Sequence, residues 1–126
     1  MSDPRHRRGA RGEQTAVEFL QRSGYRVVDR NFSCRAGEID VIAEDKDGVL
    51  CFIEVRTRRQ GAMVSGAQSV TLRKRQRIVR AAQFYCLRRQ ISDRAMRFDV
   101  VSVAASAQGE AVVDLIRNAF DAGANL

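Results

Sequence analysis

The chain has 126 residues, of which 44% are hydrophobic and 29% are charged, a composition typical of one globular domain. Its formal charge of +7, from 22 Lys and Arg residues against 15 Asp and Glu residues, favours an anionic partner such as nucleic acid or a membrane surface. No apolar run approaches the ~18 residues of a membrane span, and the N-terminus lacks the apolar core of a signal peptide. We therefore expect a cytoplasmic protein with no membrane partner.

The cysteine and histidine content limits which disulfides, metal sites and catalytic pairs the chain can form. The three cysteines, Cys34, Cys51 and Cys86, are odd in number and widely spaced, which favours reduced thiols over a disulfide framework. His6 is the only histidine, which argues against a zinc site and against a Ser–His or Cys–His catalytic pair. A bound metal is therefore expected to be Mg²⁺ or Mn²⁺ held by oxygen ligands.

The N-terminal part divides into a tail and a helix. Residues 1–9 are polar and basic, and we expect them to be disordered. Residues 10–23 have a helical pattern with an apolar stripe formed by Ala16, Val17 and Leu20. Glu13 lies on this stripe, where a carboxylate is rare without a partner. The structural alternative is an acid favoured by the positive end of the helix dipole.

The middle of the chain predicts three strands. Residues 25–30 form the first, and residues 33–37 turn the chain into a hairpin whose polar turn, residues 44–48, ends in Asp-Gly. The following run, residues 49–53, is apolar at every position, which is typical of a central strand covered on both faces.

Two carboxylates lie across this hairpin. If it is symmetric about Asp47, Asp40 faces Glu54, with Cβ atoms roughly 4.5–5.5 Å apart. The repulsion and desolvation of such a pair are removed by a divalent cation. Arg56 shares the face of Glu54. In the alternative interpretation, both acids are solvated strand ends and Arg56 is an ion-pair partner.

Basic residues dominate the next segment. Residues 57–69 have no period and predict a flexible loop that carries Arg58 and Arg59. A helix is expected over residues 70–89, capped by Ser69 or Thr71. Its basic residues, with no acid among them, are Arg73, Lys74, Arg75, Arg77, Arg80, Arg88 and Arg89. This composition favours phosphate contacts over a salt-bridged surface. The predicted nucleic-acid contacts are Arg58, Arg59, Arg73, Lys74, Arg77 and Arg80.

The C-terminal part predicts two more strands. They cover residues 96–103, where we assign Asp99 a structural role, and residues 112–116, while residues 118–126 form a weakly specified tail. Residues 10–126 are expected to form a single domain.

The hairpin motif, G-E-I-D, a turn and F-I-E-V-R-T-R, resembles the signature of PD-(D/E)XK nucleases. More closely, the chain resembles the YraN family of small uncharacterised bacterial proteins related to Holliday-junction resolvases. The match extends from about Gly9 to Phe120 and includes Gly12-Glu13, Gly24-Tyr25, Asn31, Ser69-Val70-Thr71 with Lys74, Arg97-Phe98-Asp99-Val100-Val101 and Asn118-Ala119-Phe120. The resemblance implies a restriction-endonuclease-like α/β fold, with an α-β-β-β-α-β core and a mixed central sheet flanked by helices. One residue departs from the pattern, because Arg56 stands where the family usually has lysine.

The resemblance implies a metal-dependent endonuclease acting on DNA, including branched or repair intermediates. Asp40, Glu54 and the backbone carbonyl of Val55 would bind Mg²⁺ or Mn²⁺, Glu13 would hold a water or a second metal, and Arg56 would contact the scissile phosphate. Because arginine cannot accept a proton at neutral pH, a nucleic-acid-binding protein with a degenerate site stays an alternative, and a protein-binding scaffold is a third. The oligomeric state stays open, a homodimer included.

Overall fold

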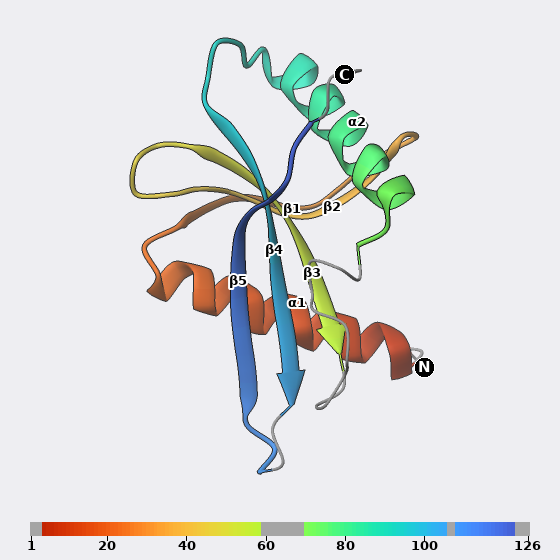
Figure 1. The fold of residues 1–126 in the computed structure, drawn as a ribbon, viewed down its shortest axis with the longest axis vertical. Helices are drawn as coiled ribbons and strands as arrows, with labels where there is room; N and C mark the ends of the chain where they lie inside the picture. Colours follow the sequence, from red (N-terminus) through yellow and green to blue (C-terminus); the bar gives the residue numbers. More distant parts are fainter. Residues whose placement is uncertain (1–3, 59–69, 106–107, 123–126) are drawn as a thin grey trace.

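The computed structural model describes residues 4–58, 70–105 and 108–122. The elements in chain order are α1 (Pro4–Arg22), β1 (Arg26–Cys34), β2 (Gly37–Glu44), β3 (Leu50–Arg58), α2 (Leu72–Arg89), β4 (Met96–Ala105) and β5 (Ala111–Phe120). The predicted α-β-β-β-α-β core, followed by a last strand, is confirmed (Figure 1). No helix within these ranges is both long and apolar enough to cross a membrane.

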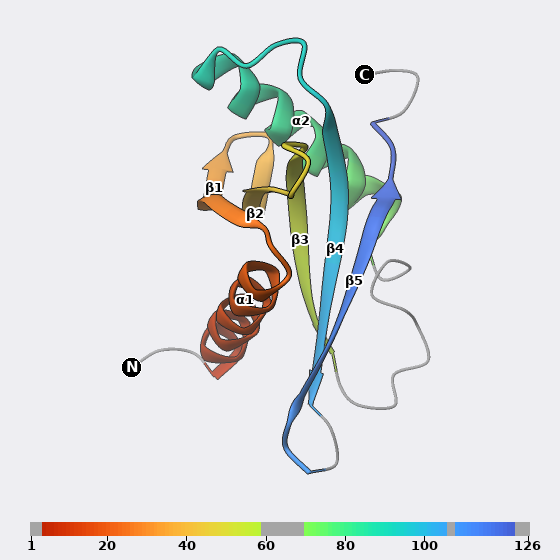
Figure 2. The same cartoon turned by 90° about the vertical axis from the view of Figure 1, so that its left-hand side faces the viewer.

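The strands form one five-stranded mixed sheet in the order β1-β2-β3-β4-β5. Neighbours are antiparallel except β3 and β4, which run parallel because the connection through α2 carries the chain back to the same end of the sheet. The two helices pack on opposite faces of the sheet, each over its own apolar core (Figure 1, Figure 2).

The apolar run at the start of β3 separates these two cores. Leu50 and Phe52 pack under α2, whereas Cys51 and Ile53 pack under α1. All four side chains are buried, so the prediction of a central strand covered on both faces is confirmed. Burial also raises the pKa of the Cys51 thiol to about 12, which keeps it protonated.

Two boundaries in the first half of the chain differ from the prediction. α1 begins at Pro4 and not near residue 10, so residues 4–9 are helical, while residues 1–3 lie outside the described part. Proline suits the first turn of a helix because its missing N–H would have no helical partner there. β1 continues to Cys34, because Asn31 takes a positive φ of 53° without ending the pairing with β2.

Two later boundaries are also wrong. β3 continues to Arg58 because it stays paired with β4, so residues 57–58 belong to the strand, and the rest of the predicted loop, residues 59–69, lies outside the described part. β5 runs to Phe120, although residues 118–126 were predicted to be a weakly specified tail. The Phe120 ring is buried and stacks on Phe98 at 5.2 Å, a tertiary contact that holds the end of the strand.

A buried ionic network joins the strands on the side of α1. The Arg97 guanidinium donates to Asp99 at 2.9 Å, to Asp45 at 2.9 Å and to the Tyr25 hydroxyl at 2.9 Å. Asp99 is fully buried and also accepts the backbone N–H of Asn118 at 2.8 Å. The network therefore ties the β2–β3 turn to β4 and β5, and Asp99 has structural partners on both.

Candidate active site

The register of the β2–β3 hairpin places Asp40 next to Glu54. The ladder pairs Glu44 with Leu50 and Val41 with Ile53, so it is symmetric about residue 47 as predicted, and the two acids follow as the next pair. Asp40 Oδ2 accepts the backbone N–H of Val55 at 2.8 Å. The Asp40 carboxylate therefore accepts a backbone hydrogen bond from β3 just beyond the last paired residues of the two strands.

Glu54 is the buried member of this acid pair, with 4% of its surface exposed. Burial first, and then the charge of the neighbouring Asp40, raise its pKa to about 7 against the lowering effect of Lys74. The Lys74 ammonium lies 2.7 Å from Glu54 Oε1, and Arg56 Nη1 lies 3.8 Å from the same oxygen. Two cations, from α2 and from β3, therefore flank one buried carboxyl group.

Glu13 approaches the pair from α1. A Cβ atom on Gly12 would collide with the side chain of Thr57, so this glycine allows α1 to pack closely on β3. Burial raises the pKa of Glu13, and the charge of Asp40 adds to the effect. With its amide nitrogen facing the carboxylate, Asn31 donates to Glu13 Oε1 at 2.6 Å. No role in the site was predicted for Asn31. An asparagine within a strand pattern is nevertheless a signal of positive φ that can be read from the sequence.

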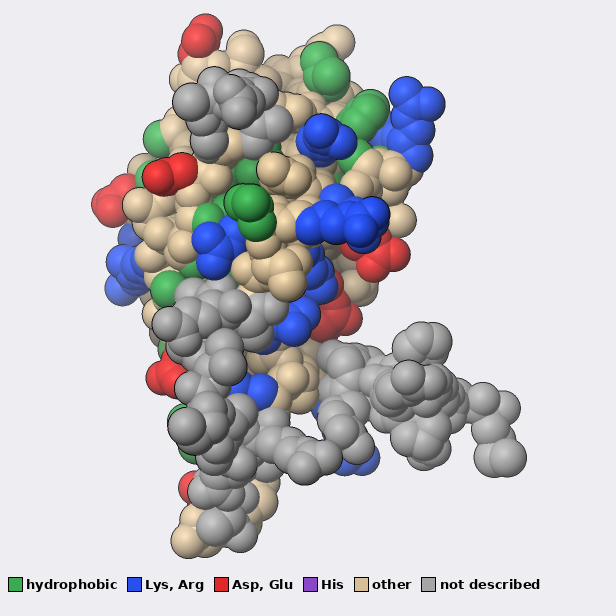
Figure 3. All heavy atoms as spheres, turned by 45° about the vertical axis from the view of Figure 1, so that its right-hand side comes forward, with side chains coloured by type: hydrophobic (Ala, Val, Ile, Leu, Met, Phe, Trp, Pro, Cys, Tyr) green, Lys and Arg blue, Asp and Glu red, His purple; other side chains and the backbone are tan. Residues whose placement is uncertain are grey.

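A cleft of about 400 Å³ opens beside the acid pair, between β2, β3 and the start of α2. It is lined by Gly37, Glu38, Asp40, Glu54, Thr71, Arg73, Lys74, Arg77 and Ile78. Thr71 caps the helix by accepting the N–H of Lys74 at 3.2 Å, and the first turn of α2 has no acidic residue. The positive end of the helix dipole therefore faces a cleft that has carboxylates on one wall and cations on the other. Figure 3 shows Lys and Arg side chains gathered on one face of the molecule, with acidic side chains at its margin.

Two of the remaining predicted residues, Arg58 and Arg80, lie farther along β3 and α2. Arg58 is at the end of β3, 3.8 Å from Asp114. Arg80 is exposed on α2 and does not line the cleft. Arg59 lies outside the described residues.

Comparison with known proteins identifies the family of the chain. Residues 12–103 match the model of the uncharacterised protein family UPF0102. The chain belongs to UPF0102. A relative from Myxococcus xanthus is 45% identical over 115 residues, covering 91% of this chain and 90% of the relative. One from Symbiobacterium thermophilum is 46% identical over 114 residues, covering 90% and 96%. One from Persephonella marina is 40% identical over 114 residues, covering 90% and 93%.

A solved structure of an EndoMS-dsDNA2 complex contains a chain with a distant likeness to this UPF0102 protein. The TM-score is 0.33 at 17% sequence identity, and the match covers 75% of this chain and 35% of that chain. Likeness at this level does not bear on the chemistry of the site, which rests on the residues of the cleft.

The donor atoms of the cleft fit a hard divalent cation. Within the described residues, no three His, Cys, Asp or Glu side chains form a ready metal-binding group. Asp40 and Glu54 supply two carboxylates, and Mg²⁺ is typically held by one or two carboxylates together with waters and substrate phosphates. The buried Glu54, whose pKa is raised, is also stabilised in its charged form by a cation between it and Asp40.

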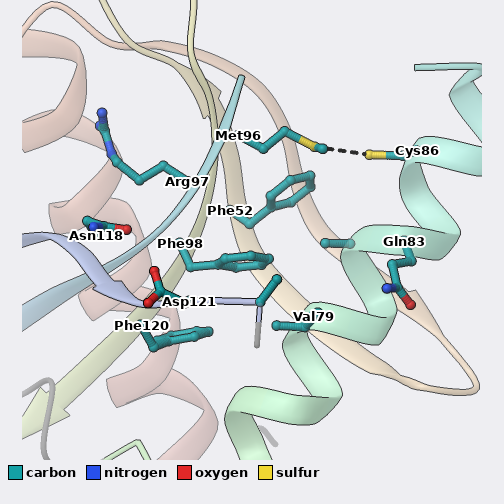
Figure 4. A pocket seen from close by; sticks show the side chains of 12 residues that line it. Phe52, Val79, Gln83, Cys86, Met96, Arg97, Phe98, Asn118, Phe120 and Asp121 are labelled. Atoms are coloured by element: carbon teal, nitrogen blue, oxygen red, sulfur yellow. Dashed lines mark hydrogen bonds between the residues drawn. The ribbon is translucent and has the colours of Figure 1, made fainter. Parts of the chain in front are cut away.

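A second cavity of about 360 Å³ lies between α2 and the β4–β5 end of the sheet. Phe52, Phe98 and Phe120 surround it, and the Arg97 side chain is directed away from it (Figure 4). Asp121 is the one acid among its lining residues in the described part of the chain. It therefore lacks the paired carboxylates that distinguish the polar cleft.

The raised pKa of Glu54 predicts a pH dependence of stability. Its pKa is about 7 in the folded chain against an ordinary value of 4.5, so between these values the folded state binds more protons. The contribution of Glu54 to the free energy of unfolding should therefore fall as the pH rises from about 4.5 to 7. Asp40→Asn should make this fall shallower, because it removes the charge repulsion and leaves the burial. Urea unfolding at pH 5, 6, 7 and 8 measures the free energy of unfolding of the wild type and of Asp40→Asn. The same pH dependence in both proteins would show that repulsion from Asp40 does not raise the pKa of Glu54.

Proposed function

We propose that this UPF0102 protein is a metal-dependent nuclease that hydrolyses phosphodiester bonds of DNA. The observation that carries the proposal is the acid pair of Asp40 and Glu54 at the wall of a cleft whose opposite wall is basic. A phosphate bound there would have the carboxylates and their cation on one side and the N-terminus of α2 on the other. This combination favours phosphodiester hydrolysis, because it stabilises the charge that develops on the phosphate while water attacks.

Asp40, Glu54 and the backbone carbonyl of Val55 would hold Mg²⁺ or Mn²⁺. The N–H of Val55 points to Asp40, and the N–H and C=O of one strand residue point to the same neighbouring strand. The carbonyl of Val55 therefore points toward β2, the strand that carries Asp40, which supports its role as a third ligand. When bound, the cation supplies Lewis-acid stabilisation of phosphate charge and a more acidic water.

Lys74 and Arg56 would stabilise the charge of the scissile phosphate. Arg56 offers a planar, permanently charged fork that suits two phosphate oxygens. Lys74 brings an ammonium to the same carboxyl group from α2, at 2.7 Å from Glu54. The chain thus has a lysine at the acid pair although position 56 is an arginine, which supports an active site over a degenerate one.

Glu13 and Asn31 would position the attacking water. The pKa of Glu13 is raised by burial and by Asp40, which brings a carboxylate closer to the proton affinity that a general base needs. The hydrogen bond from the Asn31 amide fixes the orientation of this carboxylate.

The test is incubation of the 126-residue chain with linear duplex, single-stranded and branched DNA in Mn²⁺, Mg²⁺ or EDTA. We expect cleavage of at least one substrate with a divalent cation and none in EDTA. Salt-dependent binding without cleavage of any substrate would support the alternative, a non-catalytic nucleic-acid-binding protein. A protein without affinity for any DNA would contradict both functions.

A further inference from the structure

The basic residues of α2 fall into two groups with different surroundings. Four are engaged by the protein itself: Lys74 by Glu54, Arg75 by the Val70 carbonyl and the Phe120 ring, Arg88 by the Phe32 ring, and Arg89 by Asp29 and the Tyr85 ring. The other three, Arg73, Arg77 and Arg80, are exposed. Within the described residues they have no hydrogen bond, ion pair or ring contact. Only these three arginines can bind a partner without first breaking a contact within the protein.

The three available arginines form a stripe along one face of the helix. They are spaced four and three residues apart, which places them on the same side of an α-helix. Arg73 and Arg77 line the cleft, and Arg80 continues the stripe beyond it. We call these three residues the arginine stripe. Glu38 lines the same cleft but forms no ion pair with any of them.

The length of the arginine stripe matches a short piece of nucleic-acid backbone. The eight residues from Arg73 to Arg80 are seven helical steps and span about 10 Å at a rise of ~1.5 Å per residue. One DNA strand carries a phosphate about every 3.4 Å of helix axis. The stripe therefore faces about three successive phosphates of one strand, and it begins at the cleft.

We propose that the arginine stripe binds the backbone of one DNA strand on one side of the phosphate held in the cleft. This inference rests on the proposed function for the identity of the cleft, but the binding itself needs no catalysis. A substrate must then extend about three nucleotides from the phosphate held in the cleft, on the side of Arg80. The contacts go to phosphates, so they add affinity and position without sequence preference.

The test is the salt dependence of binding in EDTA, which keeps the DNA intact. Fluorescence anisotropy with a labelled single-stranded 12-mer and a labelled duplex gives the slope of log affinity against log salt. Replacing Arg73, Arg77 and Arg80 with Gln should lessen the slope by about two for single-stranded DNA, at ~0.7 per lost contact. Replacing all three with Lys should preserve the slope, because an ammonium also contacts phosphate.

A matched control removes the same charge elsewhere. Arg22, Arg26 and Arg89 are exposed and lie outside the stripe, on α1, on β1 and near the C-terminal end of α2. Their joint replacement with Gln should change the slope by less than about 0.7, less than one contact. Equal losses in the two triple variants would overturn the stripe and indicate a net-charge effect. An unchanged DNA slope with lost binding to anionic phospholipid vesicles would overturn it in favour of a membrane surface.

The outcomes also distinguish a failure of the arginine-stripe proposal from a failure of the proposed nuclease function. Stripe-dependent binding by a wild-type protein that cleaves no DNA with Mn²⁺ would refute the proposed function and leave the stripe standing. Metal-dependent cleavage with the same salt slope in wild type and the Gln variant would refute the stripe and leave the function standing.

Discussion

Asp40→Asn is expected to lower metal-dependent DNA cleavage by at least about a thousandfold, which is roughly 4 kcal/mol of activation free energy. The amide keeps an oxygen that can accept the N–H of Val55, so the hairpin retains its hydrogen bond. It removes the negative charge that the cation requires. The variant should be as stable as the wild type at pH 7, because the repulsion with Glu54 also disappears. Single-turnover cleavage with Mn²⁺, together with urea unfolding, measures both effects.

The matched control for this variant is Asp47→Asn, the same substitution in the exposed turn of the same hairpin. The asparagine is compatible with the Asn-Gly turn that it creates, so cleavage should change by less than about threefold, or ~0.7 kcal/mol. Asp40→Asn protein that cleaves DNA at the rate of this control would remove Asp40 from the active site.

Arg97→Met is expected to reduce the free energy of unfolding by about 3–5 kcal/mol. The substitution leaves Asp99, which is fully buried, and Asp45 without their shared cation. A loss of this size is a large part of the 5–15 kcal/mol that typically stabilises a domain. Because Arg97 is among the groups that hold the pKa of Asp45 below its ordinary value, Asp45 takes up a proton more readily in the variant, and the loss should shrink as the pH falls. Urea unfolding at pH 7 and pH 5 gives both quantities.

Arg94→Met is the control for Arg97. Arg94 pairs with Glu44 at 3.1 Å, but this pair lies nearer the surface, so its loss should cost less than about 1 kcal/mol. Equal losses for the two arginine variants would show that the Arg97 network is no more important than a surface ion pair.

The order of elements could be predicted because burial leaves a pattern in the sequence. The unbroken apolar run of β3 indicated a strand covered on both faces, and both cores meet on it. The Asp-Gly turn fixed the register of the hairpin, because Asp45 accepts the N–H groups of Asp47 and Val49 and closes the turn about residue 47. That register places Asp40 next to Glu54, so the acid pair could be predicted from the sequence.

The end of β5 could not be predicted because it is specified by distant contacts. Asn118 has a φ of 51°, which interrupts the strand pattern, and the strand continues because Asp99 accepts its N–H and Phe120 stacks on Phe98. The contact between Lys74 and Glu54 is similar, since twenty residues separate them and only the packing of α2 on the sheet brings them to 2.7 Å. The sequence showed a basic helix, but it did not show which of its cations the protein itself engages.

Calorimetric titration with Mn²⁺ tests the metal-binding acid pair most directly. It is best done at pH 8, above the pKa of about 7 that burial and Asp40 give Glu54, so that protons do not compete with the metal. Wild-type protein is expected to bind Mn²⁺ weakly, and Asp40→Asn protein is expected to give only the heat of dilution. Equal Mn²⁺ binding by the two proteins would contradict a metal site at Asp40 and Glu54, and with it the proposed nuclease chemistry.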